Sequence, residues 1–131
     1  MAKEVPLGIR GEAESTVEHQ HTLNHHNKSL PAIFSTPHMI GLMEWTCRNT
    51  VLPYLEPGHD TVGTQVNVTH LAAAPIGMVV TCTAEITGVN EKRVTFRVEA
   101  RDEKEKIGEG THERAIINVA KFATRMAAKK A

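Results

Sequence analysis

The sequence predicts an α+β fold in which an antiparallel sheet wraps around one long central helix. Three observations support this. A long apolar segment begins near Ser35 and ends at Pro53. One strand-like segment precedes it, and four more follow it. Because a single apolar helix must bury its surface, a sheet that curls around it is the economical packing solution.

The start of the central helix is marked by its residue types. Ser35 or Thr36 can accept a hydrogen bond from the first helical turn, and Pro37 suits the first helical position. The following residues are apolar on nearly every side, which predicts a helix that is wrapped by other structure. Gly41 lowers helix stability, so we expect it to mark a close approach by another backbone. Glu44 lies in the middle of the helix, where a carboxylate is costly unless it is paired, protonated or used.

The strands are predicted from alternating apolar residues. Residues 8–18 form a weakly alternating, polar segment that is typical of an edge strand. Residues 61–73, 78–89, 93–101 and 107–119 form the other four strands, and turn-forming or charged residues separate them. In the first of these, one face is expected to carry Val62, Thr64, Val66, Val68 and His70. Residues 120–131 are rich in alanine and lysine and predict a short terminal helix.

This order of elements is that of the hotdog fold, and residues 1–131 are expected to form one such domain. The chain carries 15 basic and 15 acidic residues, and its aromatic content is 4%. Bulk charge and base stacking therefore do not favour nucleic acid as a partner. No apolar run reaches the ~20 residues of a membrane span, and no signal sequence is recognisable. We expect a cytoplasmic protein in which Cys47 and Cys82 are reduced and buried.

The segment before the helix contains four histidines, at positions 19, 21, 25 and 26. Their spacing does not resemble that of a zinc finger, and no cysteine is near. A solvated loop that lies over a site is the simpler interpretation. No metal or other cofactor is therefore predicted.

Several short motifs carry a resemblance to a known family. They are Gly-Leu-Met-Glu-Trp at residues 41–45, Tyr-Leu-Glu-Pro-Gly at 54–58, Val-Gly-Thr at 62–64, Val-Thr-His at 68–70 and Gly-Glu-Gly-Thr-His-Glu-Arg-Ala at 108–115. In order and spacing the sequence resembles the hotdog acyl-CoA thioesterases of the fluoroacetyl-CoA thioesterase family. The resemblance covers about residues 36 to 122.

The resemblance implies a set of site residues. Thr36, Glu44 and His70 match the family's catalytic threonine, glutamate and histidine, and Gly63 and Arg114 match its substrate-contacting residues. The fluoroacetate-specific enzyme closes its pocket with phenylalanines before the helix. Here residues 27–34 contain only one, Phe34, and Leu30 stands where a lid aromatic is expected. Leu30 and Phe34 are therefore the predicted pocket residues, and selectivity for a fluorinated acyl group is not implied.

The residues taken alone leave alternatives open. Glu44 could be a general base or nucleophile, or a core carboxylate paired with Arg48 or Arg114. Thr36 could serve the reaction, cap the helix, or do both. His70 could be a core histidine, and His112 is expected to be structural.

Geometry adds a constraint on how the site is assembled. Eight residues separate Thr36 from Glu44, which is about 12 Å along an ideal helix axis and a rotation of about 80°. Their side chains cannot touch on a straight helix, and a hotdog monomer leaves sheet edges unpaired. Both points favour a homodimer, or a dimer of such dimers, with sites at the interface.

The predicted activity is hydrolysis of a short-chain acyl-CoA to the free acid and coenzyme A. Candidate contacts for the coenzyme A phosphates are Lys92, Arg93, Lys104, Lys106 and the lysines of the tail. A non-catalytic acyl-CoA-binding module and a hotdog enoyl-CoA hydratase or dehydratase are the alternatives. Coenzyme A release, water addition and binding without turnover distinguish the three.

Overall fold

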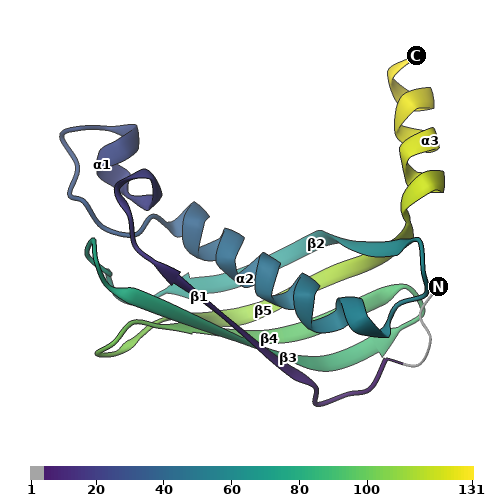
Figure 1. Cartoon of the computed structure of the whole chain (residues 1–131), viewed down its shortest axis with the longest axis horizontal. Coiled ribbons are helices and arrows are strands. Elements are labelled where there is room, and N and C mark those ends of the chain that lie inside the picture. Colours follow the sequence, from purple (N-terminus) through teal and green to yellow (C-terminus); the bar gives the residue numbers. More distant parts are fainter. Residues whose placement is uncertain (1–4) are drawn as a thin grey trace.

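The computed structural model describes residues 5–131 and shows a five-stranded antiparallel sheet that packs around one long helix (Figure 1). The sheet consists of β1 (Arg10–Thr16), β2 (His59–His70), β3 (Val79–Asn90), β4 (Arg93–Arg101) and β5 (Lys106–Asn118). The helices are η1 (His19–His21), α1 (Leu23–His26), α2 (Thr36–Val51), η2 (Leu52–Tyr54) and α3 (Val119–Lys130). The predicted hotdog fold is confirmed.

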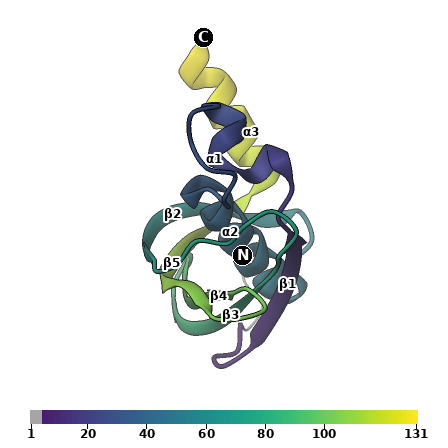
Figure 2. The same ribbon diagram turned by 90° about the vertical axis from the view of Figure 1, so that its left-hand side faces the viewer.

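The strand order is β1-β3-β4-β5-β2, so β1 and β2 form the two edges of the sheet. Figure 2 shows the sheet curving around α2. Alternate residues of β3 and β4 are buried, which matches the period-2 pattern of the sequence. Element ends differ from the predicted ones by a few residues. The largest difference is in β2, which begins at His59 and ends at His70, where residues 61–73 were predicted.

One prediction about β2 is wrong. The residues from Val62 to His70 do not all share a face in simple alternation, because the pairing with β5 shifts between Gly63 and Gln65. This bulge inserts Thr64, whose hydroxyl bonds Glu113 on the neighbouring strand. A bulge turns the following residues relative to the preceding ones, and here it brings the Gln65 carbonyl to a buried side chain, as described below.

The core lies between α2 and the inner face of the sheet. Met39, Met43, Cys47 and Val51 recur every four residues on α2 and are at most 2% exposed. They pack in one cluster with the buried residues of β3 and β4, which are Val80, Cys82, Ala84, Ile86, Val94, Phe96, Val98 and Ala100. Both cysteines are free and buried, and burial raises the pKa of the Cys82 thiol to about 11.

Two predictions about α2 are not met on the single chain. The helix is not wrapped on all sides, because Trp45 is 56% exposed on its outer face. The close approach predicted at Gly41 is not made within the single chain, since a Cβ placed there meets nothing within 4 Å among residues 5–131. One face of this apolar helix is therefore exposed to solvent on the single chain.

The histidine-rich segment is more ordered than predicted. It forms η1 and α1, and backbone bonds from Ser35 to His21 and from Leu23 to Ile33 join it to the residues before α2. The terminal helix α3 leaves the body after β5 and has no buried residue (Figure 1). Within residues 5–131, no helix is long and apolar enough to span a membrane.

Candidate active site

The first half of the candidate site lies where α2 begins. Ser35 is the N-cap, and its hydroxyl accepts from the His38 backbone N–H at 3.3 Å. The next residue, Thr36, is therefore released from capping, and its Oγ1 lies 2.8 Å from Nδ1 of His70, the last residue of β2. These two residues, 34 positions apart in the chain, form a hydrogen-bonded pair.

The His70 ring is set up to exchange a proton. Its Nε2 is buried and has no hydrogen-bond partner within residues 5–131. Burial lowers the pKa of His70, and the carbonyl of Ala72 opposes this shift. The ring is therefore neutral at physiological pH, with one nitrogen engaged by Thr36 and the other free to meet a substrate atom.

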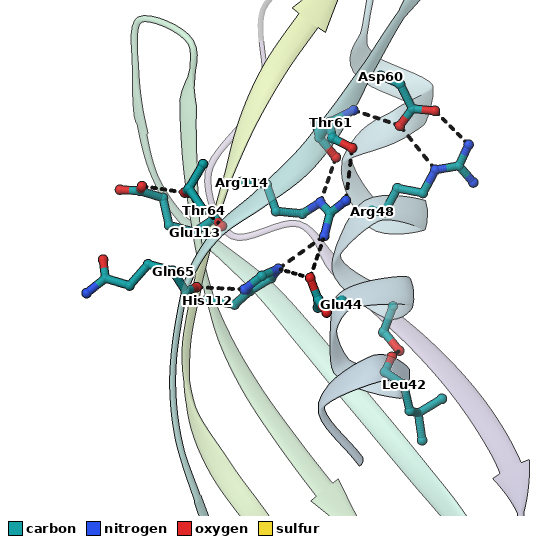
Figure 3. Close-up of polar contacts among 11 residues, drawn as sticks. Leu42, Glu44, Arg48, Asp60, Thr61, Thr64, Gln65, His112, Glu113 and Arg114 are labelled. Atoms are coloured by element: carbon teal, nitrogen blue, oxygen red, sulfur yellow. Dashed lines mark hydrogen bonds and ion pairs between the residues drawn. The ribbon is translucent and has the colours of Figure 1, made fainter. Parts of the chain in front are cut away.

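The second half of the site lies around Glu44, two helical turns along α2 (Figure 3). Its Oε1 lies 3.6 Å from Nη1 of Arg114 and 4.0 Å from Nε2 of His112. Its side chain is 40% exposed, so the predicted buried carboxylate is half-exposed on the single chain. Gly63 makes room for it, because a Cβ at that position would lie 2.5 Å from Glu44 Oε1. Glu44, Gly63, Arg114 and His112 therefore converge.

Arg114 is held in place from the side opposite Glu44. Its Nε donates to Thr61 Oγ1 at 2.7 Å, and its Nη2 donates to the Thr61 carbonyl at 2.9 Å. The residue is 7% exposed, and burial lowers its pKa, although Glu44 opposes that shift. A guanidinium pKa starts above 12, so Arg114 stays cationic and presents a fixed positive charge beside Glu44.

A pairing of Glu44 with Arg48 was one of the open alternatives. Instead, Arg48 donates to both carboxylate oxygens of Asp60, at 3.1 and 2.7 Å, and its guanidinium lies 4.9 Å from the Trp45 ring centroid. The bond from Arg48 holds the pKa of Asp60 below its usual range. Arg48 is therefore occupied elsewhere, and Arg114 is the cation beside Glu44.

The structure brings the predicted residues together in two groups. Thr36 and His70 form one, and Glu44, Gly63 and Arg114 form the other. Phe34 is 2% exposed and belongs to the core, whereas Leu30 is 40% exposed in the loop after α1. Sequence reasoning missed Thr61 as a partner of Arg114 and treated His112 as structural. No local sequence signal marks the contact of Thr61 with Arg114 or the position of His112 beside Glu44, because both depend on how the strands are paired.

The histidines before α2 form a cluster that also contains His38. Ring centroids lie 5.4 Å apart for His21 and His38, 6.0 Å for His26 and His38, and 5.4 Å for His25 and His26. Within residues 5–131, no group of three or more histidine, cysteine, aspartate or glutamate side chains has the arrangement needed to hold a metal ion.

Two further surface features bear on ligand binding. A hollow of about 960 Å³ is lined mostly by polar residues of the sheet. It contains none of the predicted catalytic or acyl-pocket residues, but Lys106, a predicted phosphate contact, lies in its lining. Of the predicted phosphate contacts, Lys106 bonds Glu99 and Glu109, and Arg93 bonds Glu113. These two cations are thus already paired with carboxylates.

An antiparallel sheet that curls around one long helix is the architecture of the hotdog fold. The family model described as fluoroacetyl-CoA-specific thioesterase matches residues 17–120. The fluoroacetyl-CoA thioesterase of Streptantibioticus cattleyicolor is 45% identical over 114 residues, which are 87% of this chain and 82% of the relative.

Solved structures give the same result. A structure of the fluoroacetyl-CoA thioesterase is 40% identical with a TM-score of 0.90, over 97% of this chain and 98% of the other. A thioesterase superfamily member from Thermus thermophilus is 31% identical with a TM-score of 0.91, over 98% and 95% of the two chains. The chain belongs to the fluoroacetyl-CoA-specific thioesterase family and is a thioester hydrolase.

Proposed function

We propose that the protein hydrolyses short-chain acyl-CoA thioesters to the free acid and coenzyme A, with Thr36, Glu44 and His70 as the catalytic set. The observation that carries the proposal is the 2.8 Å contact between Thr36 and His70, formed while Glu44 stands beside Arg114 and Gly63. Relatives support the substrate class. The fluoroacetyl-CoA thioesterase has been solved with acetyl-CoA and, in another variant, with fluoroacetate and coenzyme A.

The reaction needs a nucleophile or activated water, a proton shuttle and a donor for the developing oxyanion. Glu44 supplies the carboxylate, as nucleophile or as general base toward water. Thr36 and His70 provide hydroxyl and imidazole groups that can donate to the thioester oxygen or deliver a proton to the departing thiolate. Arg114 adds a fixed positive charge beside the carboxylate.

A complete site requires two subunits, because the two groups are separated along α2. β2 is an edge strand, and Val66 is 40% exposed near its middle. If two β2 edges pair antiparallel around Val66, His70 of the partner subunit lies opposite residues 61–63. Glu44, Gly63 and Arg114 of one chain would then face the Thr36 and His70 pair of the other. The exposed face of α2, including Trp45, borders the same interface.

The pocket is expected to discriminate weakly among small acyl groups. Phe34 is buried in the core, whereas Leu30, in the loop between α1 and α2, is 40% exposed. A hydrophobic pocket separates acyl groups that differ by one methylene by roughly 10- to 200-fold at most. Several short acyl-CoAs should therefore be hydrolysed, without a large preference for fluoroacetyl- over acetyl-CoA.

Coenzyme A release from acetyl-, fluoroacetyl-, propionyl- and butyryl-CoA tests the proposal. We expect turnover of several substrates without a large preference for fluoroacetyl-CoA over acetyl-CoA. A preference above about 10⁴-fold in kcat/KM lies beyond what such a pocket can supply. Binding without turnover, or water addition to an enoyl-CoA, would contradict it. A stronger preference for fluoroacetyl-CoA over acetyl-CoA would show that another residue replaces the missing aromatic residues before the helix.

A further inference from the structure

His112 is a buried imidazole to which the proposed reaction gives no role. It lies on β5 opposite Val66 of β2 and is 3% exposed. Its ring stacks on Phe96 of β4, with centroids 6.3 Å apart and an interplanar angle of 29°. Its two nitrogens nonetheless face polar groups, and one of these groups is Glu44. A core histidine needs no such neighbour.

The hydrogen bonds of His112 fix its tautomer. Nδ1 lies 2.8 Å from the Gln65 carbonyl oxygen, which can only accept, so Nδ1 carries the proton. The bulge between Gly63 and Gln65 presents this carbonyl to the ring. In the neutral ring, Nε2 is then an acceptor, and Arg114 Nη1 donates to it at 3.2 Å.

The arrangement divides Arg114 between several partners (Figure 3). Thr61 accepts from Nε and Nη2, and His112 accepts from Nη1. Glu44 Oε1 stays 3.6 Å from Nη1, which is beyond hydrogen-bond distance. His112 thus takes one of the two N–H groups of Nη1, and this bond holds Nη1 at 3.6 Å from the Glu44 carboxylate.

We propose that His112 is a positioning residue, which as a neutral ring protonated at Nδ1 engages Arg114 and keeps the guanidinium from closing on Glu44. The inference rests on the proposed function, in which Glu44 is the reacting carboxylate. A carboxylate with a bonded guanidinium is a weaker base and nucleophile than one with a cation at a distance. His112 therefore keeps Glu44 reactive and keeps the guanidinium of Arg114 from bonding the carboxylate.

The proposal has a consequence for pH. Protonation would place an N–H on Nε2, which faces the carboxylate of Glu44 and the cation of Arg114. Of the other charged groups near the ring, Glu113 points to the outer face, where it bonds Arg93 and Thr64. Burial and Arg114 lower the pKa of His112, while the Gln65 carbonyl, Glu44 and Glu113 oppose the shift. The ring is neutral at pH 7, and its protonation in acid would tie up Glu44.

Two substitutions at His112 test the role. His112→Phe keeps the stacking on Phe96 and removes both nitrogens, whereas His112→Gln keeps an acceptor and a donor. We expect His112→Phe to lower kcat for acetyl-CoA by about 10- to 100-fold with little change in KM, the scale of a misplaced catalytic group. His112→Gln should recover most of the lost kcat and move the acid limb of the kcat profile to lower pH. His59 is a partly exposed histidine at the start of β2. His59→Gln is the matched control and should change neither kcat nor its pH profile.

A merely structural histidine gives a different result. If folded His112→Phe keeps the wild-type kcat and pH profile and only its melting temperature moves, the proposal is wrong. If His112→Phe does not fold, nitrogen-15 chemical shifts of the wild-type ring decide. A proton on Nδ1 supports the proposal, and one on Nε2 at neutral pH overturns it. Glu44→Gln, assayed in parallel, separates this question from the proposed function, because near-full activity there removes the catalytic set whatever the His112 tautomer is.

Discussion

Gly63→Ala should damage the site with little effect on the fold. The added Cβ would lie 2.5 Å from Glu44 Oε1, 3.3 Å from His112 Cε1 and 3.6 Å from Arg114 Nη1. The backbone at residue 63 has no positive φ, so alanine fits it without strain. The nearest atom is the end of a half-exposed side chain, which can move aside by about 1 Å to reach ordinary contact.

A displacement of ~1 Å can cost up to 10²-fold in rate, so kcat for acetyl-CoA should fall by about 10- to 100-fold. The free energy of unfolding should change by less than about 1 kcal/mol, because the displaced group is not packed in the core. Gly88→Ala is the matched control. Gly88 lies in β3, which carries no site residue, and its added Cβ would lie 2.6 Å from Thr95 Oγ1 on β4. Coenzyme A release and urea unfolding measure the two effects. Wild-type kcat in a folded Gly63→Ala protein would refute the convergence of Glu44 and Gly63 at the reaction centre.

The remaining predictions concern three other features. Glu44→Gln should lower kcat by about 10²-fold or more with folding intact, and near-full activity would make Glu44 structural. Gly41→Ala should stabilise α2 by about 0.5–1 kcal/mol in a urea titration, because its Cβ meets nothing, and destabilisation would show that a partner covers that face. The pKa values of His38, His70 and His112 are all lowered, mainly by burial, so the unfolded chain binds more protons below pH ~6.5. The melting temperature should therefore fall as pH falls from about 7.5 to 5.5, and a constant value would contradict those shifts.

The fold could be predicted from the sequence because its signals are local. The Ser35 cap, the four-residue spacing from Met39 to Val51 and the alternation in β3 and β4 each act within one element. Thr36 and Glu44 lie on the predicted helix, so their positions followed directly. The predicted wrapping of α2 is not met on the single chain, because composition does not tell which part of an apolar helix the sheet covers, and Trp45 lies on the part left exposed.

The site could be predicted only in part because its geometry depends on register between distant strands. The bulge after Gly63 decides which way Gln65 and the residues beyond it point. A strand glycine often marks a bulge or a close approach, but it does not fix the register of the residues that follow. The hydrogen bond from Arg114 to Thr61 joins residues that are 53 positions apart in the chain. A buried histidine in the sequence likewise gives no indication of the cation it will meet, so the role of His112 became visible only in three dimensions.

In the shared site that we propose, Glu44 and Arg114 come from one chain, and Thr36 and His70 come from the other. A mixed dimer of Glu44→Gln and His70→Gln subunits, isolated with two different affinity tags, tests it most directly. In a shared site, one of the two sites in this dimer carries both substitutions and the other carries neither. We therefore expect about half of the wild-type kcat per mixed dimer, while both parent homodimers are inactive. A mixed dimer as inactive as its parents would show that each site is built within one chain, and would contradict the account.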